Sequence, residues 1–359
     1  MFKPCFSITP GITKALMEIE ASRQLVTTLP VTLTVLHSLR ESARLSSTHY
    51  STQIEGNRLT LQQVERVMHG GTFPNRQRDE AEVKHYYAAL DYVDALLQES
   101  PETGIRAQWV QTIHGLVMEG RAHPSAYRDG QNVIRDSVSG RIVYMPPEAC
   151  DVAGLMQDML AWVNAEIELP VPMLAAIAHY QFATIHPYYD GNGRTARLLT
   201  NLILHRSGYG LKGIYSLEEY YARNLQAYYD ALAIGESHNY YLGRAEADIT
   251  GWIAYFCSAM ADAFANVRIK VMTAAEAGSD DQTHLLRQLD QRQRQVLVLF
   301  RNNRFVTTKA LAGVLGIQPR AALNLCNQWE SNGFIVRHGA ANKLRKYELA
   351  DYWHHCLNL

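Results

Sequence analysis

Apolar residues follow helical spacing over most of the chain. In the middle of the sequence they recur at i, i+3, i+4, i+8 and i+11, which places them on one face of a helix. That set is Leu174, Ile177, Ala178, Phe182 and Ile185, and a second set downstream is Leu198, Leu199, Leu202 and Ile203. Stretches with Gly and Pro at 70–74 and 100–104 break the pattern. The pattern predicts a mostly α-helical fold.

Residues 132–145 are the exception to the helical spacing. Two segments that suit strands, 132–135 and 141–144, flank a turn-rich stretch at 136–140. This order predicts a β-hairpin, which Pro146-Pro147 closes off.

The last part of the chain, 285–359, has a pattern of its own. It predicts helices at 292–300, 307–315 and 320–330, then two strands between Phe334 and Leu349 around a turn at 339–342. This order is similar to the winged helix-turn-helix fold. Residues 274–283 are small and polar. We therefore predict an N-terminal helical region (1–100), a core (101–262), a linker region (263–284) and a C-terminal winged-helix domain (285–359).

Composition narrows the class of protein. Apolar residues make up 47% and charged residues 19% of the 359 residues, as in an ordinary globular protein. No apolar run reaches the roughly 18 residues of a membrane helix, and the N-terminus lacks the features of a signal peptide. The five cysteines are scattered and form no CxxC pair, so they predict neither a disulfide framework nor a zinc site. We expect a cytoplasmic protein with no membrane partner.

Charge divides the chain into two unlike parts. From residue 285 onward eleven Lys and Arg stand against four Asp and Glu, a net of +7, whereas the first 284 residues have a net of −8. The basic part favours an anionic partner such as DNA, although winged helices also serve in dimerisation or target docking. The groups that could face DNA are Arg320, Asn324, Asn327 and Gln328 on the third helix, and Arg337, Lys343, Arg345 and Lys346 on the wing.

The stretch from His186 to Arg197 lies between the two central helices. Gly191 and Gly193 permit backbone conformations closed to other residues, so successive N–H groups can converge on an anion where the second helix begins. Arg194 and Arg197 lie on one side of the first helical turn. Two guanidinium groups beside such amides suit a polyphosphate.

Two further residues in this stretch could serve as a metal ligand and as a general base. Asp190 can hold a Mg²⁺ ion that bridges phosphates, and His186 can take a proton near neutral pH, as a general base must. Taken singly, each residue has an ordinary alternative, a surface histidine or a solvated charge beside a Gly-rich connection. The ordered set of twelve residues favours a nucleotide site.

These twelve residues resemble the signature of the Fic family, HPFx[D/E]GNGRxxR, with Tyr188 in place of the usual Phe. The resemblance extends over about Trp109 to Phe256. It implies a helical bundle that binds ATP and transfers AMP to a Ser, Thr or Tyr hydroxyl of a target protein, releasing pyrophosphate. Relatives that transfer phosphate carry Lys at the position of Gly193, so this glycine favours AMP transfer. Many relatives are homodimers, and we expect a homodimer here.

The resemblance also implies a role for each residue of the loop. His186 would deprotonate the target hydroxyl and Asp190 would hold Mg²⁺. The phosphate contacts would come from Gly191, Asn192 and Gly193 (α and β), Arg194 (β) and Arg197 (γ). By position in the family, Tyr228 and Tyr229 would lie near the adenine, and Ile142, Val143 and Tyr144 would form the edge of a flap that pairs with an extended target segment. Core tyrosines and an ordinary surface hairpin are the alternatives.

Glu55 stands at the end of a predicted helix, before Gly56 at a position suited to a helix C-cap. A new helix then starts with Thr60 and Gln63 at capping-box spacing. The dipole makes a helix C-terminus unfavourable for a carboxylate by roughly 0.3–1 kcal/mol, so Glu55 favours a cationic partner. A solvated glutamate beside a turn is the alternative.

Ser51 and Glu55-Gly56 resemble the inhibitory motif of Fic proteins, [S/T]xxxE[G/N]. The resemblance implies that Glu55 pairs with Arg197, keeps it from the γ-phosphate and leaves ATP in an unproductive pose. As in some relatives, Glu55 would also orient a water molecule that removes AMP from targets. We therefore expect an adenylyltransferase inhibited by Glu55. The competing hypotheses are an ATP-sensing, DNA-binding transcription regulator and a scaffold with a degenerate pocket.

Overall fold

The computed structural model describes residues 2–29, 33–97, 99, 103–135, 139–234, 238–277, 289–338, 345–350, 352 and 353, without the side chains of 33, 34, 274–277, 291, 301 and 302. The chain divides into two compact units, Met1–Ala275 and Glu276–Leu359, and each is described by itself.

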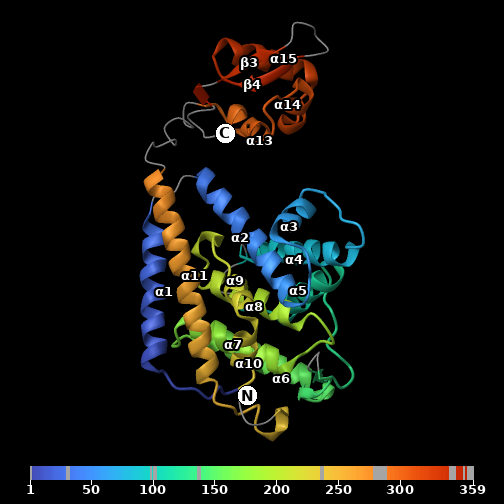
Figure 1. Ribbon diagram of the computed structural model, residues 1–359, viewed down its shortest axis with the longest axis vertical. Helices are drawn as coiled ribbons and strands as arrows, with labels where there is room; N and C mark the ends of the chain where they lie inside the picture. Colours follow the sequence, from blue (N-terminus) through green and yellow to red (C-terminus); the bar gives the residue numbers. More distant parts are fainter. Residues whose placement is uncertain are drawn as a thin grey trace. The chain divides into compact units, whose positions relative to one another are not determined.

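The first unit is a bundle of helices (Figure 1). In chain order they are α1 (Pro10–Thr28), α2 (Leu33–Ile54), α3 (Leu61–Met68), α4 (Gln77–Leu96), α5 (Ala107–Glu119), α6 (Ala149–Ala165), α7 (Val171–Ile185), α8 (Asn192–Arg206), α9 (Glu218–Arg223), α10 (Leu225–Leu232) and α11 (Thr250–Ala277). Two short 3₁₀ turns, Leu211–Gly213 and Tyr240–Leu242, lie between them. The mostly helical fold that the sequence predicts is confirmed.

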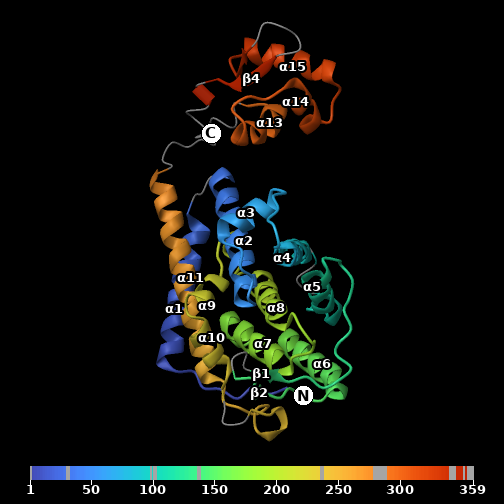
Figure 2. The same cartoon turned by 45° about the vertical axis from the view of Figure 1, so that its right-hand side comes forward.

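Helices α7 and α8 form the centre of this unit and pack against each other, with α6 beside α7 and with α4 and α5 beside α8 (Figure 2). The apolar positions that predicted these two helices are buried. Trp252 of α11 ties that helix to α7, because its indole N–H donates to the Ala176 carbonyl at 2.7 Å. Among the described helices, none combines the length and apolar content needed to cross a bilayer.

The predicted hairpin is present in this unit. Strand β1 (Ile134–Arg135) pairs antiparallel with β2 (Ile142–Tyr144), with Ile134 opposite Tyr144. The Tyr144 hydroxyl donates to the Thr184 carbonyl of α7 at 2.7 Å. This buried side chain fixes the hairpin beside the end of α7. Residues 136–138 of the predicted turn lie outside the described ranges.

The predicted linker at 263–284 is wrong over residues 263–277. Helix α11 continues without interruption to Ala277, so the predicted core boundary at 262 falls inside a helix. Phe264, Val267 and Val271 repeat at helical spacing and are buried in the main core. Their burial explains why the helix extends past the boundary that the small, polar residues at 274–283 suggested. Residues 278–284 lie outside the described ranges.

The second unit contains the elements predicted for 285–359. Helices α13 (Gln291–Asn302), α14 (Thr308–Leu315) and α15 (Pro319–Ser331) precede the antiparallel strands β3 (Ile335–His338) and β4 (Lys346–Leu349). They enclose a core of their own around Phe300, Trp329 and Phe334. The side chains proposed to face DNA from α15 are exposed: Arg320, Asn324, Asn327 and Gln328.

On the predicted wing, Arg337 forms a 3.5 Å ion pair with Glu330, whereas Lys343 lies outside the described ranges. The winged-helix assignment, DNA binding and homodimerisation stay predictions.

Candidate active site

The loop between α7 and α8 is shaped by two residues in the left-handed region of backbone conformation. His186 ends α7 with φ 51° and ψ 60°, and Gly191 precedes α8 with φ 74°. This conformation is costly for a residue with a Cβ, and glycine adopts it freely. At Gly191 the space is also closed, because a Cβ there would lie 2.7 Å from the Met118 sulfur. The chain therefore turns sharply twice within six residues and directs the first amides of α8 into the site.

Asn192 stabilises this loop with both ends of its side-chain amide. Its Oδ1 accepts from the Tyr188 N–H at 3.0 Å, and its Nδ2 donates to the Tyr188 carbonyl at 2.8 Å. Because the side chain is buried and engaged in the loop, the group that Asn192 offers to an anion is its backbone N–H. Tyr188 itself is 2% exposed and stacks on the His114 ring, so it fills the packing position expected of the usual Phe.

Arg128 and His114 support the loop from outside it, and sequence reasoning missed both. The Arg128 guanidinium donates to the His186 carbonyl at 3.0 Å, and its backbone N–H donates to the Pro187 carbonyl at 2.9 Å. His114 Nε2 lies 3.0 Å from the Asp190 carbonyl oxygen. No local motif marks either residue, because each acts on atoms at least 58 residues away in the sequence.

The His186 imidazole is neutral at physiological pH. Burial lowers its pKa to about 4, and the positive charge of Arg128 acts in the same direction. A neutral imidazole has a free lone pair, which is the form that accepts a proton.

Asp190 and Arg194 form an ion pair beside the first amides of α8. The Asp190 side chain is 61% exposed, and its Oδ1 lies 2.6 Å from the Gly191 nitrogen and 3.5 Å from the Arg194 guanidinium. Arg194 is 4% exposed, and its Nε has no hydrogen-bond partner among the described residues. A buried donor without a partner is typical of a site that a ligand completes.

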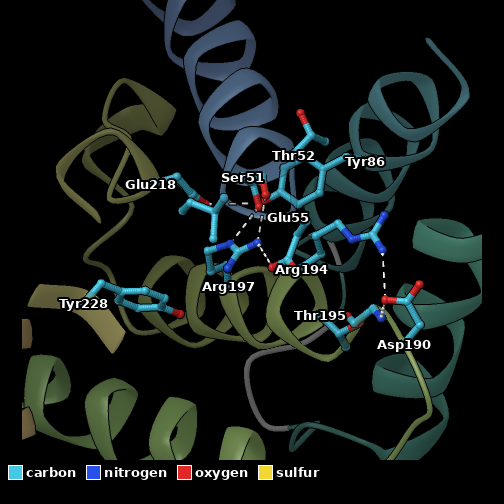
Figure 3. A network of polar contacts seen from close by, with 12 residues as sticks. Ser51, Thr52, Glu55, Tyr86, Asp190, Arg194, Thr195, Arg197, Glu218 and Tyr228 are labelled. Atoms are coloured by element: carbon cyan, nitrogen blue, oxygen red, sulfur yellow. Dashed lines mark hydrogen bonds and ion pairs between the residues drawn. The ribbon is translucent and has the colours of Figure 1, made fainter. Parts of the chain in front are cut away.

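Glu55 pairs with Arg197 across the start of α8, as Figure 3 shows. One Arg197 nitrogen lies 2.8 Å from Glu55 Oε1 and 2.9 Å from the Ser51 carbonyl oxygen, and Nε donates to the Ser51 hydroxyl at 2.8 Å. The Arg197 side chain is 1% exposed. Burial by itself would lower its pKa, but the Glu55 carboxylate together with the Tyr228 and Tyr86 hydroxyls outweighs burial and raises it. Arg197 is thus a fixed cation fully engaged by the end of α2.

The same carboxylate lies over Gly193. A Cβ at this position would lie 2.4 Å from Glu55 Oε1 and 3.2 Å from an Arg197 nitrogen. Glu55 immediately follows the last residue of α2, where the dipole of that helix is unfavourable for a carboxylate. The N-terminus of α8 is the positive end of its helix dipole and favours negative charge. Glu55 therefore occupies the position where that helix would attract an anion.

The two tyrosines of α10 differ in exposure. Tyr228 is 2% exposed, and its hydroxyl lies 3.0 Å from His179 Nε2. Tyr229 is 44% exposed, and its hydroxyl reaches the Ile54 carbonyl at 3.4 Å. Of the pair, Tyr229 presents a ring surface that a ligand could touch.

The three flap residues also differ from one another. Ile142 and Val143 are exposed, whereas the Tyr144 side chain is buried against α7. Only Ile142 and Val143 therefore have side chains available to an extended target segment.

Comparison with known proteins places this geometry in a family. Residues 104–204 match the model of the Fic/DOC family. Protein adenylyltransferase fic-1 of Caenorhabditis elegans is 32% identical over 195 residues, which is 53% of this chain and 37% of that protein. Protein adenylyltransferase Fic of Drosophila erecta is 32% identical over 202 residues, 55% of this chain and 39% of that protein. The chain thus spans two fifths or less of the length of these curated relatives.

Solved structures agree with this match. A Fic family protein from Desulfovibrio desulfuricans G20 has a TM-score of 0.59 at 25% identity and covers 98% of this chain and 99% of its own. Residues 134–508 of C. elegans Fic-1 have a TM-score of 0.58 at 25% identity and cover 74% of this chain and 73% of their own. Residues 104–204, which contain the signature loop, thus match the Fic/DOC family, and these two solved Fic structures share the fold of the chain.

Proposed function

We propose that this chain is a protein adenylyltransferase that transfers AMP from ATP to a hydroxyl group of a target protein, and that Glu55 inhibits it. The observation that carries the proposal is the Glu55 carboxylate, which lies on the first turn of α8 and pairs with Arg197. The N-terminus of a helix binds anions, and here a carboxylate of the same chain occupies it. This arrangement is expected of a nucleotide site that is blocked by its own chain. The names of the curated relatives support the same activity.

The phosphate groups of ATP fit the residues present. The first amides of α8, at Asn192, Gly193 and Arg194, have no partner inside the helix and direct their N–H groups outward. The unpartnered Nε of Arg194 would gain an acceptor from a phosphate oxygen. Arg197 would hold the γ-phosphate once Glu55 leaves it.

The donor set also fits Mg²⁺. This ion binds through one or two carboxylates and completes its coordination with phosphate oxygens and water. Asp190 supplies one exposed carboxylate beside the proposed phosphate site, and when bound the ion would neutralise phosphate charge.

His186 would take the proton of the target hydroxyl. The hydroxyl oxygen forms a bond to the α-phosphorus of ATP, and the bond from that phosphorus to the oxygen bridging to the β-phosphate breaks. AMP stays on the target and pyrophosphate leaves. The lowered pKa of His186 keeps the imidazole in its proton-accepting form at neutral pH. The exposed flap residues Ile142 and Val143 would hold the target segment by strand addition.

The test uses the Glu55→Gly protein with ATP labelled at either the α- or the γ-phosphate. AMP transfer predicts label on protein from the α-labelled ATP and none from the γ-labelled ATP. Label from the γ position would show phosphate transfer and would contradict the proposal.

A further inference from the structure

Glu218 is a buried carboxylate that the proposed chemistry does not use. It is the first residue of α9 and is 1% exposed. Burying a carboxylate is unfavourable unless hydrogen bonds replace its hydration. Four side-chain donors surround it: Ser47 Oγ at 3.0 Å, the Tyr86 hydroxyl at 3.2 Å, Asn201 Nδ2 at 3.2 Å and Ser216 Oγ at 2.9 Å.

Two of these donors connect Glu218 to the end of α2, the helix that Glu55 directly follows. Ser47 lies on α2 one turn before Ser51, and it donates to one oxygen of Glu218. Tyr86 of α4 donates to the other oxygen, and it lies next to Ser51 at the end of α2. Both contacts therefore converge on the last two turns of α2, and Figure 3 shows Glu218, Tyr86 and Ser51 beside one another.

Ser51 joins this buried cluster to the proposed nucleotide site. Its hydroxyl accepts from Arg197 Nε and its carbonyl accepts from a second Arg197 nitrogen. The end of α2 is thus held at two places, by Arg197 at the site and by Glu218 behind it.

We propose that Glu218 is a positioning residue that fixes the end of α2 and thereby keeps Glu55 on Arg197. This inference rests on the proposed function. Glu218 lies away from the phosphate-binding amides and contacts the inhibitory helix, so its loss should release inhibition and leave the transfer chemistry intact.

The substitution Glu218→Gln keeps the size of the side chain and replaces one acceptor oxygen with a donor. Two of the four donors then face the amide NH2, which cannot accept a hydrogen bond, and the charge that strengthens all four bonds is gone. Loss of one hydrogen bond to a charged group changes an equilibrium by about tenfold, so the fraction of molecules with α2 displaced should rise by about tenfold.

The experiment measures transfer of α-phosphate label in four proteins: wild type, Glu218→Gln, Glu55→Gly and the double variant. We expect about a tenfold increase for Glu218→Gln over wild type and no increase when it is added to Glu55→Gly. A residue with only a structural role would lower transfer in both backgrounds, so that outcome, or no increase over wild type, overturns the inference.

A smaller change and a matched control accompany these variants. Ser47→Ala removes a single donor to Glu218 and should raise transfer in the same direction. Thr48→Val is the control, because Thr48 is the next residue on α2, is fully buried, and has a hydroxyl without a partner among the described residues. An equal increase in the control would overturn the specific role of Glu218.

Amide hydrogen exchange at residues 47–57 tests the same inference without an activity assay. The exchange rate should rise by about tenfold in Glu218→Gln and stay unchanged in Thr48→Val. Absence of transfer in Glu55→Gly would contradict the proposed function, whereas unchanged exchange in Glu218→Gln would overturn the positioning role.

Discussion

Glu55 Oε1 lies so close to Gly193 that a methyl group on that glycine would approach it to 2.4 Å. A side chain at residue 193 would therefore displace the carboxylate from its observed position. This contact joins the two motifs, one at residue 55 and one in the loop, that the sequence presents far apart.

Because of this contact, we expect substitutions at Gly193 and Glu55 to have non-additive effects on the free energy of unfolding. Gly193→Ala should lower the free energy of unfolding by up to about 1 kcal/mol, because the new methyl group displaces the flexible end of Glu55 from Arg197. In a Glu55→Gly background the same change should be neutral or stabilising by up to about 1 kcal/mol, since alanine favours a helix over glycine. Chemical denaturation of the four proteins measures the coupling, and equal effects of Gly193→Ala in both backgrounds would show that the two positions do not compete for space.

Removal of the proposed base should stop the chemistry and leave the fold intact. In the Glu55→Gly background, His186→Ala should lower AMP transfer by roughly 10²–10⁴-fold, the usual contribution of a general base. The proposed phosphate contacts of Gly193 and Arg194 do not involve this side chain, so ATP affinity measured by calorimetry should change little. Transfer that persists in the His186→Ala variant would remove histidine as the base.

Two buried histidines predict how stability depends on pH. Burial lowers the pKa of His179 to about 3 and that of His186 to about 4, below the unfolded value of roughly 6.5. Below that value the unfolded chain binds protons that the folded chain does not, so the free energy of unfolding should fall as pH drops from about 6.5 toward 4.

The variant His179→Gln should show a smaller fall over this pH range than wild type. Chemical denaturation at pH 7 and pH 5 measures it, with His37→Gln as the control, because the side chain of His37 is exposed. Identical pH dependence in wild type and His179→Gln would contradict a contribution from His179.

The sequence was informative where function depends on neighbours along the chain. The twelve-residue loop and the motif at Glu55 are local patterns, and the structure brings Glu55 and Arg197 together as the family resemblance implies. Arg128 and Glu218 were not predictable, because each acts through contacts with residues distant in sequence. The boundary at 262 failed for a related reason, since burial of Phe264 and Val267 extends α11 past it.

The central claim is that Glu55 blocks a competent adenylyltransferase by holding Arg197. To test this, wild type, Glu55→Gly and Glu55→Gly/His186→Ala are each incubated with Mg²⁺ and ATP labelled at the α-phosphate. We expect faint label on protein for wild type, strong label for Glu55→Gly and none for the double variant. Equal label for wild type and Glu55→Gly would show that the ion pair with Arg197 does not inhibit, and no label in any protein that nevertheless binds ATP would contradict AMP transfer itself.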